Sequence, residues 1–176
     1  AVGGGVAEML HRVVPLLNEL GIETGWEVIK GGADFFDITK AFHNALQGKE
    51  EHFEQQVFET YLAYNEMNYQ EMSFDEDLIV IHDPQPAALI DWQKKRKNKW
   101  VWRCHIDMSH PNQQVWDFLR NYVELYDAAI FSSPLFSPQL KIPQYHLPQG
   151  SLLGSWLERQ KRNQLKNQFF CLLLYF

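Results

Sequence analysis

Cysteine is scarce in this chain, which has two in 176 residues. Two cysteines do not make the disulfide framework on which small secreted domains depend. No apolar run is long enough to cross a bilayer, and no signal peptide is visible. These absences predict a cytoplasmic protein with no membrane partner.

Positive charge is also in short supply. The formal net charge is −6, and residues 1–150 carry 12 Lys and Arg against 21 Asp and Glu. General nucleic-acid binding needs a cationic footprint, so we expect no nucleic-acid partner. The one basic cluster, residues 94–99, lies at the end of a predicted helix. Cations at the carboxyl end of a helix interact favourably with the helix dipole. We therefore interpret the cluster as a solvated helix end rather than as a phosphate-binding patch.

The apolar residues that are present follow a regular alternation. Apolar runs predict strands at 26–29, 78–82, 100–106 and 128–131, and periodic segments predict helices at 6–20, 34–46, 50–72, 86–97 and 111–126. Continuous apolar strands separated by helices indicate a parallel sheet covered on both faces. The predicted fold class is therefore α/β, a Rossmann-like doubly wound domain.

Polar, titratable residues follow two of these strands. His82 ends the predicted strand at 78–82 and is followed by Asp83 and Gln85. His105 stands near the end of the predicted strand at 100–106, and Asp107 follows it. Ligands of open α/β sheets bind at the carboxyl ends of strands, so both groups are candidate site residues. A metal site is conceivable here, but the spacing matches no standard ligand pattern and none is predicted.

Structural roles compete with these functional ones. Asp83 stands before Pro84 and would make a good helix N-cap, and Asp107 would help Ser109 cap the helix at 111–126. Arg103, inside a buried strand, is expected to pair with an acid from a neighbouring element. His43 falls on a predicted helix and is expected to be an ordinary surface residue.

The amino-terminal segment is rich in glycine. Gly3, Gly4 and Gly5 stand directly before a predicted helix, where backbone N–H groups can approach a phosphate or a sugar hydroxyl. No strand precedes this loop in the sequence, so we expect a fragment whose first strand is missing. A flexible tail is the alternative.

Three motifs together resemble the trehalose synthases, which are retaining glycosyltransferases of the GT-B class. They are Ala1-Val-Gly-Gly-Gly-Val-Ala-Glu-Met-Leu10, His82-Asp-Pro-Gln-Pro-Ala87 and Trp102-Arg-Cys-His-Ile-Asp107. The resemblance covers residues 1–146. It implies an N-terminal, acceptor-side Rossmann-like domain that faces a second domain across a cleft. The implied reaction transfers glucose from UDP-glucose or ADP-glucose to glucose, with no cofactor and no obligatory metal.

The resemblance also assigns roles to residues. His105 would stand beside the donor sugar as the catalytic histidine, and Gly3, Gly4 and Gly5 would face the donor diphosphate. His82, Asp83 and Gln85 would line the acceptor side, and Asp107 is a further substrate-binding candidate. The nucleotide would be held by the C-terminal domain that this chain lacks, and the whole enzyme could form a homodimer.

Residues 147–176 depart from the family pattern. A Pro-Gly-Ile stretch encoded CCA-GGG-ATC-G becomes Gln-Gly-Ser when it is read one base later, and Gln149, Gly150 and Ser151 stand at this point. We hypothesise that this atypical tail is frame-shifted. On its own the chain is then expected to be inactive. The alternatives are a trehalose phosphorylase of the same class and a non-catalytic sugar-binding half-domain.

Overall fold

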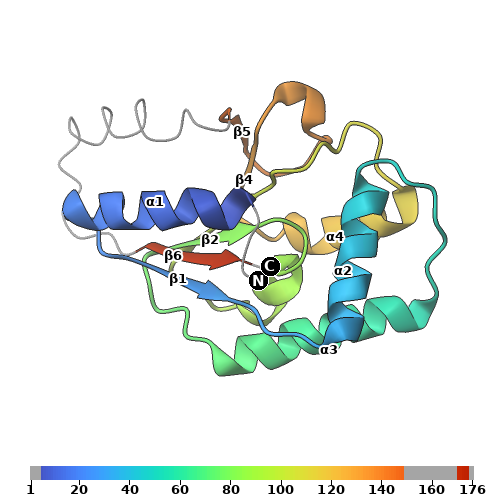
Figure 1. The fold of residues 1–176 in the computed structure, drawn as a ribbon, viewed down its shortest axis with the longest axis horizontal. Coiled ribbons are helices and arrows are strands. Elements are labelled where there is room, and N and C mark those ends of the chain that lie inside the picture. Colours follow the sequence, from blue (N-terminus) through green and yellow to red (C-terminus); the bar gives the residue numbers. More distant parts are fainter. Residues whose placement is uncertain (1–4, 149–169, 175–176) are drawn as a thin grey trace.

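The computed structural model describes residues 5–148 and 170–174, which form a single sheet flanked by helices (Figure 1). The elements in chain order are α1 (Gly5–Glu19), β1 (Thr24–Val28), α2 (Ala33–Leu46), α3 (Gln55–Glu71), β2 (Leu78–His82), the 3-10 helix η1 (Ala87–Trp92), β3 (Lys99–Arg103), α4 (Gln113–Val123), β4 (Ala128–Phe131), the 3-10 helix η2 (Pro134–Phe136), β5 (Gln144–His146) and β6 (Phe170–Leu174).

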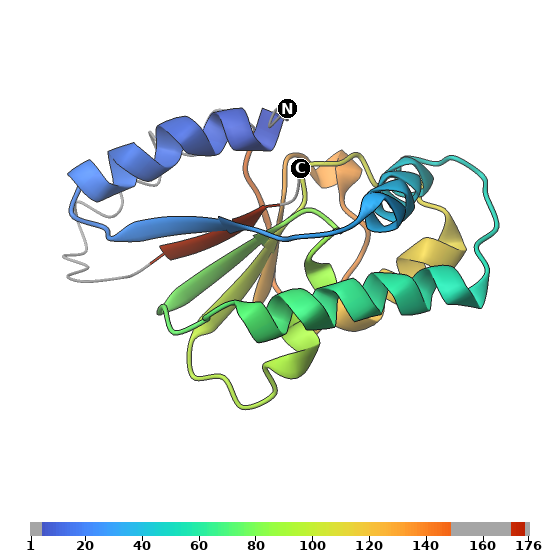
Figure 2. The same cartoon turned by 60° about the horizontal axis from the view of Figure 1, so that its bottom comes forward.

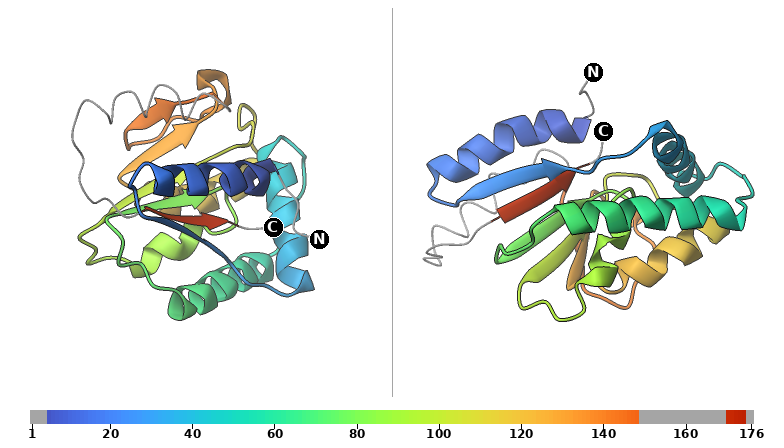
Figure 3. Two further views of the ribbon diagram at one scale, coloured as in Figure 1. Left: turned by 60° about the vertical axis from the view of Figure 1, so that its left-hand side comes forward. Right: turned by 90° about the horizontal axis from the view of Figure 1, so that it is seen from below.

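The sheet has the order β1-β6-β2-β3-β4-β5, and every neighbouring pair is parallel. Helix α1 covers one face, while α3, η1 and α4 lie against the other (Figure 2). The views of Figure 3 show the same two layers from other sides, with α1 running along β1. The predicted α/β class with a parallel sheet covered on both faces is confirmed.

Strand β2 shows why the sheet needs both layers. Ile79 and Ile81 are fully buried in the large core formed with α3, η1 and α4. Val80, between them, points to the opposite face and packs with Leu10 of α1 in a smaller core. Because alternate side chains of a strand face opposite sides, a strand that is apolar throughout requires cover on both.

The position between β1 and β2 is taken by β6. In a doubly wound sheet of the order 2-1-3-4-5, the strand that precedes the first helix lies at this place. Within the described residues no strand precedes α1, and the vacant position is filled by a segment from residues 147–176. The domain boundary at residue 146 and the frame-shift hypothesis stay predictions.

Three predicted helices differ from the structure, and the one expected at 50–72 begins only at Gln55. The helix expected at 86–97 is only η1, and the basic run Lys94–Lys97 lies in the loop that follows it. Four adjacent cations repel one another and offer no apolar stripe for packing, so helix formation has little support there. The helix expected from 111 begins at Gln113, and its N-cap is Asn112 rather than Ser109.

No helix in the described residues is long and apolar enough to cross a membrane. Cytoplasmic location stays a prediction.

Candidate functional site

The carboxyl ends of β2 and β3 lie side by side, as the sequence predicts. His82 is in register with Arg103 across the ladder. Beyond the ladder, the N–H of Asp83 donates to the carbonyl of Arg103 at 2.8 Å, and the N–H of His105 donates to Asp83 Oδ1 at 2.8 Å. The Asp83 carboxylate therefore links the two strand ends and does not act as a helix cap.

The backbone at Asp83 has an unusual conformation. Its φ of 64° lies in the left-handed region, where Asp and Asn are the commonest residues after glycine. The carbonyl of Asp83 accepts a hydrogen bond from Trp102 Nε1 at 2.8 Å, which stabilises this backbone conformation. This turn places the carboxylate against the neighbouring strand end.

Two histidines stack behind this turn. The rings of His82 and His105 are 5.1 Å apart with an interplanar angle of 9°, and His82 Nδ1 lies 2.8 Å from His105 Nε2. His82 is only 4% exposed, and its Nε2 has no hydrogen-bond partner in the described part of the chain. One ring must donate and the other accept, so the bond requires at least one neutral imidazole.

Burial controls the charge of these groups. Desolvation lowers the pKa of His105 to about 3, with a smaller contribution from Arg103. Desolvation also lowers the pKa of His82 well below its ordinary value, helped by His105 and Arg103. Burial raises the pKa of Asp83 to about 6, against the opposing effects of the His105 N–H and Arg103. At pH 7 the site therefore holds two neutral imidazoles and one carboxylate.

A cavity of about 320 Å³ opens at this edge of the sheet. Its lining comes from the start of α1, from α2 and from the two strand ends. The residues are Gly5, Val6, Met9, His43, Asp83, His105 and Ile106. The arrowheads of β1 and β6 in Figure 1 point towards α2, and α1 begins at the same end. This is the edge where doubly wound domains bind ligands.

The structure brings some of the predicted site residues to this cavity and leaves others away from it. Asp83, His105 and Gly5 line it, whereas His82 lies buried behind His105. Gln85 is half-buried, and its Oε1 has no partner among the residues the structure describes.

Three further predicted residues have other positions. Asp107 is exposed, is absent from the lining and accepts a hydrogen bond from the N–H of Ser109 at 2.9 Å. Gly3 and Gly4 lie outside the described residues. Direct sugar contacts by any of the predicted residues stay predictions.

His43 is the titratable residue of the cavity lining that was not predicted from the sequence. It lines the cavity, and burial lowers its pKa, so the expectation of an ordinary surface histidine is wrong. A signal was present, because His43 follows Phe35 and Thr39 at intervals of four residues and both are buried on α2. That spacing places His43 beside the buried stripe of the helix.

Arg103 also differs from its prediction. The side chain is 2% exposed, and its guanidinium forms no ion pair within 4 Å with an acid of the described residues. It donates to the carbonyl of Phe131 at 3.1 Å and to that of Leu147 at 2.8 Å. The Phe131 carbonyl also accepts from the backbone N–H of Leu147 at 2.8 Å, so the guanidinium adds a second link between the ends of β4 and β5. Arg103 therefore connects the end of β3 to the ends of β4 and β5, next to the candidate site.

Two other kinds of chemistry have little support at this edge. No three His, Cys, Asp or Glu side chains in residues 5–148 and 170–174 are grouped closely enough to hold a metal ion. Cys104 is a buried free thiol, and burial raises its pKa well above the ordinary value, so it is not a thiolate nucleophile.

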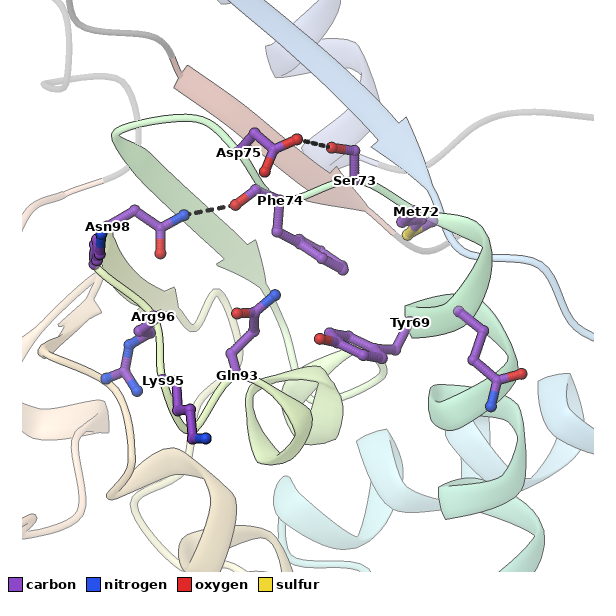
Figure 4. Close-up of a pocket in the computed structure, with 11 residues that line it drawn as sticks. Tyr69, Met72, Ser73, Phe74, Asp75, Gln93, Lys95, Arg96 and Asn98 are labelled. Atoms are coloured by element: carbon purple, nitrogen blue, oxygen red, sulfur yellow. Dashed lines mark hydrogen bonds between the residues drawn. The ribbon is translucent and has the colours of Figure 1, made fainter.

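A larger cavity, of about 640 Å³, lies at the amino ends of β2 and β3 (Figure 4). Its polar groups are largely engaged within the protein. Asp75 accepts from Ser73, Asn98 donates to the carbonyl of Phe74, and Arg96 donates to the carbonyl of Leu125. It lacks the perturbed, converging groups of the smaller cavity, which we take as the candidate site.

The fold and the site define a Rossmann-like domain with a candidate ligand cavity at the carboxyl edge of a parallel sheet. Residues 1–138 match the family model described as "Trehalose synthase, N-terminal domain". This chain belongs to that family.

Relatives support the assignment. The chain is 52% identical to a trehalose synthase of Pyrococcus horikoshii over 134 residues, which is 75% of this chain and 32% of the relative. It is 41% identical to that of Rubrobacter xylanophilus over 135 residues, 74% and 32% of the two chains. A trehalose phosphorylase of Pleurotus pulmonarius is 30% identical over 149 residues, 73% and 20%. The chain thus spans about a third of the length of the synthases it matches.

Proposed function

We propose that this chain is the acceptor-side half of a retaining GT-B glucosyltransferase that forms trehalose from a nucleotide-glucose donor and glucose. The observation that carries the proposal is the convergence of His105, Asp83 and the start of α1 on one cavity, in a chain of this family. UDP-glucose and ADP-glucose are the proposed donors. No metal or other cofactor is part of the proposal.

The chemistry follows from the groups at the cavity. A neutral His105 can hydrogen-bond a sugar hydroxyl without bringing a charge, and Asp83 can accept from a second hydroxyl. At Gly5 an added Cβ would meet no atom of the described residues within 4 Å, which leaves room for a ligand beside the start of α1. Helix N-termini favour anions, which suits the departing diphosphate.

In this proposal the chain supplies no carboxylate nucleophile. The donor phosphate deprotonates the acceptor hydroxyl on the same face of the sugar, and the oxygen of the acceptor replaces the leaving diphosphate. Most of the catalysis is then positioning of the two sugars and stabilisation of the leaving group. The second domain holds the nucleotide, so the chain alone is expected to be inactive.

A phosphorylase that acts on trehalose and phosphate is the second candidate. The match to the Pleurotus pulmonarius enzyme favours it, because the same domain type occurs in a protein with that name. The higher identity to the synthases makes the synthase the first choice. A cytoplasmic location belongs to the proposal, and the free Cys104 thiol is compatible with it.

A domain exchange tests the proposal. Residues 1–138 would replace the matching segment of the Pyrococcus horikoshii synthase, and trehalose formation from UDP- or ADP-glucose plus glucose would be measured. We expect trehalose from the chimera and a large loss in its His105→Ala variant. Glucose release only from trehalose with phosphate would favour the phosphorylase.

The isolated chain provides the matching control. NMR titration with glucose or trehalose should shift signals at the cavity, with no product formed when the donor is added. Sugar binding by the chain together with an inactive but folded chimera would support the non-catalytic sugar-binding half-domain and contradict the synthase.

A further inference from the structure

We propose that His82 is a positioning residue, whose Nδ1–H donates to His105 Nε2 and so keeps His105 as the tautomer that carries its proton on Nδ1. His105 then offers the cavity an uncharged hydrogen-bond donor. The tautomer itself follows from the geometry of the pair, and only its use towards a sugar hydroxyl rests on the proposed function.

The geometry first removes His82 from direct contact with a ligand. The ring is 4% exposed and does not line the cavity, while His105 does. The two rings are nearly parallel and share one short bond, 2.8 Å from His82 Nδ1 to His105 Nε2. This bond occupies Nε2 of His105, so Nδ1 is the ring nitrogen left for a ligand.

The buried nitrogen of His82 decides the direction of the bond. His82 Nε2 has no partner in the described residues. If His105 donated, His82 would carry its proton on this Nε2, and an N–H donor would be buried without an acceptor. If His82 donates, Nε2 is a bare lone pair. A nearby cation favours a lone pair over an N–H, and the positive charge of Arg103 acts on this ring.

A second histidine differs in effect from the carboxylate that often stands behind a catalytic histidine. A carboxylate orients the ring and also favours its protonated form. His82 orients the ring without adding charge, and the desolvated pair stays neutral. A neutral donor is suited to a sugar hydroxyl, and it forms no ion pair that would hold the diphosphate product. Asp83, the one carboxylate among the described residues that line the cavity, accepts a hydrogen bond from the backbone N–H of His105.

The primary test is NMR of the histidine side chains in the whole 176-residue chain labelled with ¹⁵N-histidine. Long-range ¹H–¹⁵N correlation spectra distinguish protonated from unprotonated ring nitrogens. We expect His105 to show a protonated Nδ1 and an unprotonated Nε2 between pH 5.5 and 8. A protonated Nε2 on His105 would overturn the proposal, whether or not the protein makes trehalose.

Two variants separate positioning from simple packing. His82→Asn keeps an amide N–H near the place of Nδ1, and His82→Phe keeps a ring but removes the donor. We expect His105 to keep its tautomer in H82N and to show mixed tautomers in H82F. The exposed His52→Phe serves as the control for loss of a histidine ring. If H82F fails to fold, the wild-type chain and H82N still decide the matter.

The same variants in the domain-exchange chimera connect the tautomer to catalysis. H82F should lower kcat by about 10-fold with little change in KM, and H82N should recover most of that loss. Equal losses in H82N and H82F, with the His105 tautomer unchanged in both, would show that His82 acts only through packing. An inactive parent chimera would count against the proposed function, while the tautomer result would still stand.

Discussion

At the scale of single residues, Asp83 has two features that each destabilise the fold and that a purely structural role does not require. It adopts a positive φ, and its carboxylate is kept ionised at pH 7 although burial raises its pKa to about 6. Asparagine would tolerate the same backbone conformation and could accept the same hydrogen bond from His105 without the buried charge. A charge retained at such a place is typical of a functional site.

Replacement of Asp83 by Asn should therefore stabilise the fold. A raised carboxyl pKa means that the folded state loses stability as pH rises from 3.8 towards 6, and D83N removes this penalty. We expect a gain of about 2 kcal/mol in urea unfolding at pH 7.5, shrinking as the pH falls below 6. D107N is the matched control, since the hydrogen bonds of Ser109 lower the pKa of that exposed carboxylate and no gain is expected. A destabilised D83N protein at pH 7.5 would contradict this account.

The histidine pair should make the protein sensitive to acid. The pKa of each ring is lowered on folding, so the unfolded chain binds more protons below its ordinary value of 6.5. The stabilising effect is complete above pH 6.5 and is lost as the pH falls below that value, down to about 3 in the case of His105. Asp83 has the opposite effect on stability, because its raised pKa lets the folded state bind one proton more readily than the unfolded chain as the pH falls. We expect a net loss of roughly 2 kcal/mol between pH 7 and 5, measured by urea unfolding.

Variants of the pair give the corresponding control. H82F removes one of the two neutral rings, so its unfolding free energy should depend less steeply on pH over this range. An identical slope in the wild-type chain and H82F would show that His82 is not held neutral by the fold.

Residue-level prediction from the sequence reached the two strand ends but not their internal arrangement. The apolar runs before His82 and His105 placed both residues at one edge of a parallel sheet, which is confirmed. The inward orientation of His82 and the positive φ of Asp83 had no local signal. Both depend on contacts across the sheet, such as the bond from Trp102 Nε1 to the carbonyl of Asp83.

At the scale of elements, Asn112 and Ser109 are the two candidates for the N-cap of α4, and the structure assigns this role to Asn112. Asn112 Oδ1 accepts from the N–H of Val115, and Asn112 Nδ2 donates to the carbonyl of Glu51. Ala at this position should cost about 1–2 kcal/mol because it removes the cap and the tie to the preceding loop. Asp should lose only the tie, and Ser109→Ala should change stability by less than about 0.5 kcal/mol. Thermal unfolding that is more sensitive at Ser109 than at Asn112 would contradict the assignment.

Element prediction was most successful where periodicity was strong and least where charge interrupted it. The strands at 78–82 and 128–131 were predicted with the bounds that the structure has. The prediction of a helix at 86–97 was wrong because the second half of this segment is a basic run without apolar partners. Strand β5 was not predicted, since three residues with little burial give no pattern, and its place depends on pairing with β4.

At the scale of the whole molecule, β1 is joined to the rest of the sheet through β6. A proline at Leu172, the middle of β6, would remove a ladder donor and should disrupt pairing with both neighbours. We expect a loss of about 3 kcal/mol or more, together with faster hydrogen exchange in β1 than in β3. Leu172→Val keeps every backbone donor and is the control. Unchanged exchange in β1 of L172P would show that β6 does not hold that strand.

The whole sheet could not be derived from local patterns. No strand was predicted from the sequence in the apolar run at residues 170–174. This run lies between β1 and β2, from which it is distant in the sequence. Helix and strand periodicity describes local segments and does not predict which distant strands pair.

The order of synthesis gives β6 a further consequence. Of the described strands, β2, β3 and β4 follow one another along the chain and can pair as they leave the ribosome, whereas β1 pairs with β6, which is translated after the other five. Contacts between segments so far apart slow folding, and an unpaired strand edge invites association with other chains. We therefore expect the edges of β1 and β2 that pair with β6 to stay unpaired during translation until residue 174 has left the ribosome.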